Sequence, residues 1–240
     1  MGLKAGIIGL PNVGKSTIFN ALTKSEIPAE NYPFCTIDPN VGIVEVPDKR
    51  INDIADVFNP KVITPAVVEF VDIAGLVKGA SKGEGLGNKF LSHIRDVDAI
   101  VHVVRAFEEE NVTHVEGSLD PIRDIEIIET ELLIRDIASV EKRMEKLQKT
   151  ARIGDKESKD ELAVLELIFP QMNDGTLVHE IALEANQKKR IRQRDLLTNK
   201  PTLYVANVDE TEITAEKRSA TLQTLFDFAG KKQNAAIRLC

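Results

Sequence analysis

The stretch LKAGIIGLPNVGKSTIFNA, residues 3–21, decides the fold of this chain. It begins with an apolar run typical of a buried parallel strand and ends in a segment with helical spacing. Between them lies GLPNVGKS, residues 9–16. This matches the pattern G-x-x-x-x-G-K-[ST] in its expected place between a strand and a helix. A simple glycine turn in front of a helix is the alternative, and we place it second.

The residue types in this loop suit a bound triphosphate. Gly9 and Gly14 let the backbone curl around phosphates, and the following helix supplies N–H groups that lack partners. Lys15 provides a positive charge for the β and γ phosphates, and the Ser16 hydroxyl is a ligand for Mg²⁺. The residues predicted to bind the nucleotide here are Asn12, Val13, Gly14, Lys15, Ser16 and Thr17.

Composition restricts the class of protein. The chain has 240 residues and a net charge of −7, which argues against a generally basic nucleic-acid-binding protein. Its two cysteines, Cys35 and Cys240, make no disulfide framework, which suits a reducing cytosol. No apolar run approaches the roughly 20 residues of a membrane span. We therefore expect a soluble, cytoplasmic monomer without a membrane partner.

Strand-like and helix-like segments alternate along most of the chain. Strands are expected at residues 3–9, 41–46, 67–71, 99–104, 202–206 and from 235 onward. Helices are expected at residues 15–23, 48–58, 90–95 and 216–229. This alternation predicts an α/β fold, a doubly wound and mostly parallel sheet of the P-loop NTPase type. The last strand stops at Cys240 without a covering helix, so we expect a fragment of a longer protein.

A helical segment interrupts this alternation. Asp120-Pro121 is a typical helix start, and from Leu133 to Leu147 apolar residues recur at spacings of 4, 3, 4 and 3. Further helices are expected at 161–169, ending before Pro170, and at 178–197. The predicted domains are a P-loop domain, residues 1–119 and 199–240, and a helical insertion, residues 120–198, folded as an antiparallel hairpin. Helices that simply cover the sheet are the alternative.

A second nucleotide element follows an apolar strand. Asp72-Ile73-Ala74-Gly75 has the D-x-x-G pattern, in which the Asp72 carboxylate reaches Mg²⁺ directly or through water. The Gly75 N–H can sense the γ-phosphate and so link the following loop to the nucleotide state. Thr36, in a Pro-containing loop, is a candidate second hydroxyl ligand, although a lone threonine needs no such role. The predicted Mg²⁺ ligands are Ser16, Thr36 and Asp72.

The element expected to select the base is Asn207-Val208-Asp209-Glu210. A guanine-specific site uses Asn-Lys-x-Asp, whose aspartate accepts hydrogen bonds from two N–H positions that adenine lacks. Here the lysine is replaced by Val208, and the aspartate by Glu210, which is one methylene longer. This disturbs the guanine-binding arrangement, so adenine becomes plausible. The predicted base-binding residues are Asn207, Val208 and Glu210.

Taken together, residues 9–16, 31–36, 72–80 and 207–210 resemble the Obg-like ATPase (YchF) family of translation-factor-class P-loop GTPases. The resemblance covers essentially the whole chain. It implies Mg²⁺-dependent hydrolysis of ATP in preference to GTP, and a nucleotide-driven switch that associates with ribosomes in translation or stress response. Since we expect a fragment, we also expect it to lack the C-terminal TGS domain of that family.

Hydrolysis needs a group that positions water. The residue after D-x-x-G is a water-orienting glutamine in Ras-like proteins, but here it is Leu76. The resemblance implies a histidine in its place, and His114 is the match, although a solvated loop residue is the alternative. The predicted catalytic residues are therefore His114, Lys15 and Gly75. In related NTPases an asparagine at the position of Asn12 helps coordinate K⁺, but an asparagine in a tight turn needs no further reason.

The dense basic run at residues 188–194, from Lys188 to Arg194, is the candidate contact for ribosomal RNA. A solvated helix face is the alternative. Two further functions stay open: a GTP-specific GTPase of the same fold, and a non-hydrolysing nucleotide-dependent binding module. A metabolic P-loop kinase is disfavoured because D-x-x-G and N-x-x-E are features of switches.

Overall fold

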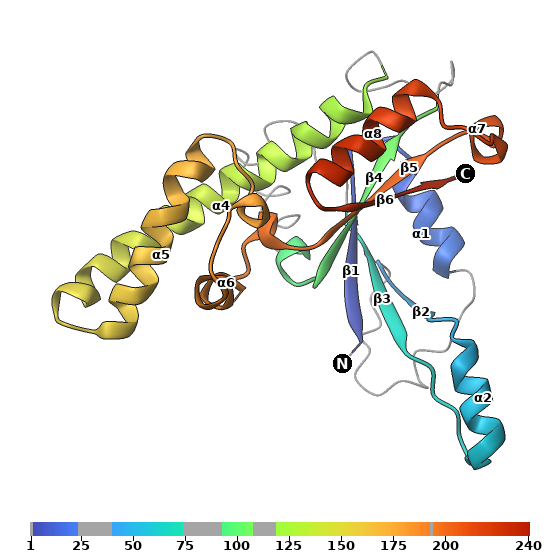
Figure 1. Cartoon of the computed structure of the whole chain (residues 1–240), viewed down its shortest axis with the longest axis horizontal. Helices are drawn as coiled ribbons and strands as arrows, with labels where there is room; N and C mark the ends of the chain where they lie inside the picture. Colours follow the sequence, from blue (N-terminus) through green and yellow to red (C-terminus); the bar gives the residue numbers. More distant parts are fainter. Residues whose placement is uncertain (1, 24–39, 74–92, 108–118, 193) are drawn as a thin grey trace.

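The computed structural model describes residues 2–23, 40–73, 93–107, 119–192 and 194–240. These residues form a six-stranded sheet with helices on both faces, from which a helical arm extends (Figure 1). The strand order is β2-β3-β1-β4-β5-β6, and only the β2–β3 pair is antiparallel. The strands are β1 (Leu3–Ile8), β2 (Val41–Glu45), β3 (Val67–Asp72), β4 (Ala99–Arg105), β5 (Thr202–Asn207) and β6 (Ala235–Leu239). The predicted doubly wound, mostly parallel sheet is confirmed.

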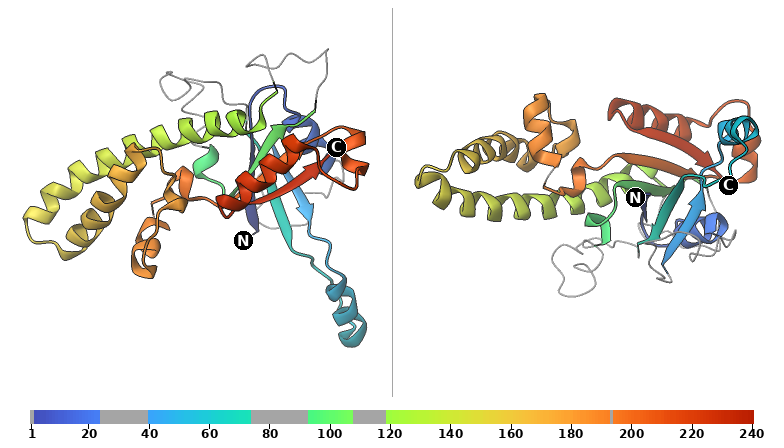
Figure 2. Two further views of the ribbon diagram at one scale, coloured as in Figure 1. Left: turned by 45° about the horizontal axis from the view of Figure 1, so that its top comes forward. Right: turned by 90° about the horizontal axis from the view of Figure 1, so that it is seen from below.

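Helices of very different length surround this sheet. α1 and α8 lie on opposite faces of it (Figure 2). The helices are α1 (Lys15–Thr23), α2 (Lys49–Phe58), α4 (Pro121–Arg152), α5 (Lys156–Asn173), α6 (Ala185–Arg192), α7 (Glu210–Thr214) and α8 (Ala220–Lys231), with short 3₁₀ helices η3 (Val178–Glu180) and η4 (Leu197–Asn199). None of the helices in the described ranges is both long and apolar enough to cross a bilayer.

The register of the central strands places the nucleotide motifs next to each other. Ile7 and Ile8 are fully buried near the end of β1, because parallel strands covered on both faces are apolar throughout. Ile7 pairs with Asp72 of β3, and Ile8 pairs with His102 of β4. The loop after β1 and the carboxylate at the end of β3 therefore meet at the same edge of the sheet.

α4 belongs to both the sheet and the arm. The Asp120 side chain accepts a hydrogen bond from the Arg123 N–H (3.1 Å), so the helix begins where the sequence predicts. In its first half, Ile125 and Ile128 pack in the core of the sheet. In its second half, the predicted seam packs against α5, with Val140 buried in one cluster with that helix. The division of the chain at residue 120 stays a prediction.

Two predicted helices differ in extent. α5 begins at Lys156, because the Asp155 side chain caps it by accepting a hydrogen bond from the Ser158 N–H (2.8 Å). The helix continues through Pro170 to Asn173. α8 begins only at Ala220, after a separate short helix, α7, that the sequence did not indicate.

The helix predicted at 178–197 is wrong. The segment contains η3, α6 and the start of η4, with irregular chain between them. After α6 the backbone turns at Asp195, which has a left-handed φ of 49°. The Asp136 carboxylate then accepts hydrogen bonds from the Leu197 and Thr198 N–H groups (2.9 and 2.8 Å). These bonds from α4 satisfy backbone groups that a continuous helix would have paired internally.

Candidate nucleotide-binding site

The loop between β1 and α1 is curled in a way that requires glycine. Gly9 and Gly14 have φ angles of 151° and 95°. A Cβ at Gly9 would collide with the carbonyl oxygen of Val103 in β4, and a Cβ at Gly14 would collide with the side-chain amide of Asn207. Both positions combine an unusual φ with a close neighbour, so only glycine fits them.

The other residues predicted to bind the nucleotide at the phosphate loop are partly buried in the core and partly exposed. Val13 is buried in the main hydrophobic cluster, so it offers its backbone, and not its side chain, to a ligand. Asn12 is exposed with a left-handed φ of 62°, and the side chain of Thr17 is exposed in the first turn of α1. The geometry of a tight turn accounts for Asn12, and K⁺ coordination by this residue stays a prediction.

Lys15 is a buried cation that makes one side-chain hydrogen bond within the described part of the chain. Its side chain is 8% exposed, and Nζ donates to the Leu10 carbonyl (2.8 Å) within the same loop. Burial lowers the pKa of Lys15, and the nearby Asp72 carboxylate opposes that shift. An ammonium group has three protons to donate, so an anionic phosphate at this loop would supply acceptors that the loop itself does not.

Ser16 and Asp72 form an oxygen pair suited to a hard cation. Ser16 Oγ donates to Asp72 Oδ2 (2.9 Å). Asp72 Oδ1 is buried, and within the described ranges it has no hydrogen-bond partner. Mg²⁺ prefers oxygen ligands and usually takes one or two from the protein, the others coming from phosphates and water. The residues present therefore fit Mg²⁺.

Asn207 binds the phosphate loop directly. It lies at the end of β5, and its Nδ2 donates to the Val13 carbonyl (3.0 Å). The residue predicted to contact the base therefore also holds the loop that would surround the phosphates. No local sequence pattern indicates this contact, because the two residues are 194 positions apart.

Of the other three residues of the base element, Val208 and Asp209 make structural contacts, and Glu210 is free to contact a base. Val208 has its side chain buried beside β5, and its N–H donates to the Leu239 carbonyl (2.8 Å). Asp209 caps α7 by accepting a hydrogen bond from the Glu212 N–H (2.8 Å). Glu210 is exposed, and its carboxylate makes no hydrogen bond within the described part of the chain. Glu210 is thus the acidic side chain of this motif that remains available to a base.

Three predicted site residues, Thr36, Gly75 and His114, lie outside the described residues. The predicted Mg²⁺ hydroxyl of Thr36 and the catalytic roles of Gly75 and His114 stay predictions.

His102 and Arg105, both on β4, are buried polar residues that the sequence analysis did not select. Burial lowers the pKa of His102 to about 3, and the Lys15 charge adds to the shift. The His102 ring lies 5.8 Å from that of Tyr204. Arg105 lies over the Phe107 ring, and its Nε donates to the Phe107 carbonyl (3.0 Å). The signal that could have found both is a polar residue inside an otherwise apolar strand.

The basic run at 188–194 does not form one free stripe. Arg190 pairs with Asp160 (3.0 Å), and Arg194 pairs with Glu161 (2.8 Å), both on α5. Lys188 and Arg192 make no ion pair within the part of the chain that the structure describes.

Comparison with known proteins agrees with this geometry. Residues 4–165 match the protein family described as 50S ribosome-binding GTPase. The chain is 49% identical, over its full length, to "Ribosome-binding ATPase YchF" of Haemophilus influenzae and 50% identical to the protein of that name from Bacillus subtilis. The solved structure of the Schizosaccharomyces pombe YchF GTPase superimposes on 99% of the chain with a TM-score of 0.81 at 40% identity.

The chain belongs to the YchF family of P-loop GTPases. It spans 65% and 66% of the two curated relatives and 65% of the S. pombe chain. The shared YchF architecture accounts for the sheet with its phosphate loop and for the helical arm.

Proposed function

We propose that this chain is the nucleotide-binding part of a Mg²⁺-dependent switch that hydrolyses ATP in preference to GTP. In this proposal it acts as a monomer at the ribosome, in the cytoplasm. The observation that carries the proposal is the arrangement around the phosphate loop, where buried Lys15 and the Ser16–Asp72 pair converge. The names of the two bacterial relatives, ribosome-binding ATPases, support the substrate and the partner.

The roles of the chain's own residues follow from their positions. Lys15 binds the β and γ phosphates after its ammonium group leaves the Leu10 carbonyl. Ser16 and Asp72 would hold Mg²⁺, which when bound neutralises charge on the phosphates. His114 orients or deprotonates the attacking water, since Leu76 cannot form a hydrogen bond with it.

The preference for ATP rests on the base element. Val208 replaces the lysine and Glu210 replaces the aspartate of the guanine-binding pattern, so the side chains that select guanine are not reproduced. Glu210 has an acceptor that can reach the exocyclic amino group of adenine. This arrangement favours adenine without excluding guanine by a steric clash.

Calorimetric titration of the chain with ATP and with GTP, both with Mg²⁺, tests the proposal. We expect tighter binding of ATP, followed by phosphate release, and loss of binding in Lys15→Ala. Tighter binding of GTP would favour the GTP-specific alternative. Binding without phosphate release would favour a non-hydrolysing module.

The role of His114 needs a separate variant. His114→Ala should slow phosphate release and leave the affinity for ATP unchanged, because the histidine acts on water and not on the nucleotide. Loss of both properties, or of neither, would contradict the role. Cosedimentation of the wild-type chain with purified ribosomes tests the proposed partner.

A further inference from the structure

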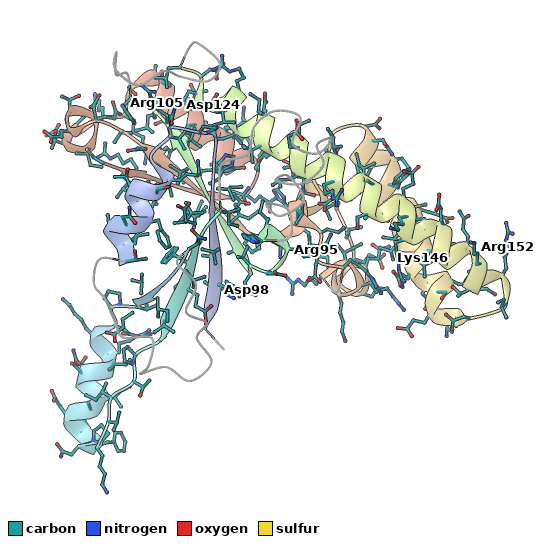
Figure 3. All side chains as sticks on the ribbon, turned by 180° about the vertical axis from the view of Figure 1, so that it is seen from behind. Arg95, Asp98, Arg105, Asp124, Lys146 and Arg152 are labelled. Atoms are coloured by element: carbon teal, nitrogen blue, oxygen red, sulfur yellow. The ribbon has the colours of Figure 1, made fainter. Side chains whose placement is uncertain are left out.

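A groove of about 860 Å³ lies at the edge of the sheet opposite the phosphate loop. It is lined by residues that precede the parallel strands, among them Asp98 before β4, Pro201 before β5 and Asn234 before β6. The phosphate loop follows the carboxyl end of β1 instead. Figure 3 shows Asp98 and Arg105 at the two ends of β4. That strand has seven residues, so the groove and the nucleotide site are roughly 20 Å apart.

The acidic residues of this groove lie close to two lysines. Lys232 lies 2.9 Å from Glu180. Lys200 donates to the Val97 carbonyl (2.6 Å), and the charges of Asp195, Asp98 and Asp96 act on its ammonium group. The groove wall as a whole carries six lysine and arginine side chains against four carboxylates, Asp96, Asp98, Glu180 and Asp195.

Four further cations of the groove stay available. They are exposed, come from three separate segments and form no ion pair within the described ranges. Lys188 and Arg192 lie four residues apart on α6, which places them on one face of that helix. The four are Arg95, Lys188, Arg192 and Lys231.

Two other arginines of the same basic run are engaged in ion pairs and do not add to the charge of the groove. Arg190 and Arg194 belong to the same basic run, but Asp160 and Glu161 of α5 bind them. Of the three cations of this run without an ion pair in the described ranges, Lys188 and Arg192 line the groove and Lys189 does not. In a chain with a net charge of −7, the four available cations of the groove form a local positive site for a polyanion.

We propose that this groove binds the phosphate backbone of RNA. No Phe, Tyr or Trp of the described ranges lies along its wall, and its one imidazole, His179, is half-buried with Nδ1 2.9 Å from the Thr198 carbonyl oxygen, so the wall offers bases little surface for stacking. Contacts should therefore go to phosphates, and binding should depend on salt more than on sequence. The proposal rests on the ribosome-associated function and names the surface that meets RNA. Because the groove lies far from the phosphate loop, RNA and nucleotide can be bound together.

The test compares two variants of equal charge. The groove variant carries Arg95→Ala, Lys188→Ala, Arg192→Ala and Lys231→Ala. The control variant carries Lys142→Ala, Lys146→Ala, Lys149→Ala and Arg152→Ala, which are exposed on the outer half of α4. Figure 3 shows Lys146 and Arg152 at the far end of the arm, away from Arg95.

The probe is a fluorescein-labelled RNA hairpin of mixed sequence, followed by anisotropy between 50 and 200 mM KCl. The groove variant should bind at least about ten-fold more weakly at 50 mM and show a shallower salt dependence, by about 0.7 to 0.9 in logarithmic slope per lost phosphate contact. The control variant should bind like the wild type. Equal loss in both variants, no loss in either, or no binding by the wild type would overturn the proposal.

Two measurements separate this proposal from the proposed function. ATP titration and circular dichroism of both variants should match the wild type, which excludes misfolding as the cause of weaker RNA binding. If the wild type and the groove variant cosediment equally with ribosomes, the groove proposal fails while the ribosome remains the partner. If the hairpin binds the groove but the wild type does not cosediment with ribosomes, the proposed partner fails and the groove stands.

Discussion

Asn207 connects the base element to the phosphate loop. Its amide donates to the Val13 carbonyl, so Asn207→Ala removes a hydrogen bond that holds the loop in place. One such bond contributes about 1 kcal/mol. We expect Asn207→Ala to weaken ATP and GTP binding by a similar factor, about five- to ten-fold, because the loop contacts the phosphates that both nucleotides share. Isothermal titration calorimetry with each nucleotide measures this.

Glu210→Ala is the matched comparison for that prediction. The Glu210 carboxylate is exposed and does not touch the phosphate loop in the described structure, so its removal should change the ratio of ATP to GTP affinity. If Asn207→Ala changed only that ratio, a role in holding the loop would be refuted.

His102 gives the folded protein a pH dependence. Burial lowers its pKa from 6.5 to about 3, so the folded state keeps the imidazole neutral while the unfolded chain takes up a proton below about pH 6.5. The contribution that neutral His102 makes to the free energy of unfolding is complete above pH 6.5 and is lost as the pH falls toward 3. Between pH 7.5 and 5.0, wild type should lose about 2 kcal/mol more of its free energy of unfolding than His102→Phe.

Urea denaturation at the two pH values measures that difference. In His102→Phe a phenyl ring that does not titrate takes the place of the imidazole beside Tyr204. Carboxylates protonate in both proteins, so their effect on the free energy of unfolding cancels in the comparison. Parallel pH dependences for wild type and variant would show that His102 is not kept neutral by burial.

At the scale of elements, one carboxylate joins α4, α5 and the segment after α6. Glu161 accepts two hydrogen bonds from Arg143 and one from Arg194, all at 2.8 Å, and its side chain is 6% exposed. Glu161→Gln would leave both guanidinium groups facing a neutral amide. We expect the free energy of unfolding to fall by about 2 kcal/mol. The fall is not larger because both arginines are partly exposed, so water can replace some of the hydrogen bonds that they lose.

Asp160 supplies the control at the neighbouring position of α5. It pairs with Arg190, but its side chain is 46% exposed, so Asp160→Asn should lower the free energy of unfolding by less than about 0.5 kcal/mol. Chemical denaturation of the two variants measures the difference. Equal costs would mean that burial of Glu161 does not strengthen its ion pairs.

The elements also show what local sequence can and cannot predict. The strand β1, the loop after it and α1 follow from an apolar run, two glycines and helical spacing, all of which act locally. The break between α6 and η4 does not, because it depends on Asp136 in a distant part of α4. The contact of Asn207 with Val13 and the burial of His102 likewise need the assembled sheet. The motif therefore predicts the phosphate site, while the groups that hold it in place emerge only from the fold.

At the scale of the whole molecule, a partly buried polar network joins four elements. Lys232 at the end of α8 binds Glu129 of α4 and Glu180 of η3, each at 2.9 Å. Tyr204 of β5 donates to the other oxygen of Glu129 (2.5 Å). The network lies where the arm meets the sheet, so it contributes to the stability of that junction.

Lys232→Met tests this junction because methionine keeps most of the side-chain volume and removes the charge. Glu129 and Glu180 would then face each other without a cation, and we expect a loss of about 3 kcal/mol in the free energy of unfolding. Lys231→Met is the control, since Lys231 is exposed and should change stability by less than about 0.5 kcal/mol. Urea denaturation should be followed by far-ultraviolet circular dichroism and by tyrosine fluorescence, both in a Tyr32→Phe background, where Tyr204 is the remaining tyrosine and its fluorescence reports on the junction. A Lys232→Met protein as stable as Lys231→Met would mean that apolar packing alone holds the arm against the sheet. Separate transitions for the two probes, with fluorescence changing first, would instead show that the junction opens before the sheet unfolds.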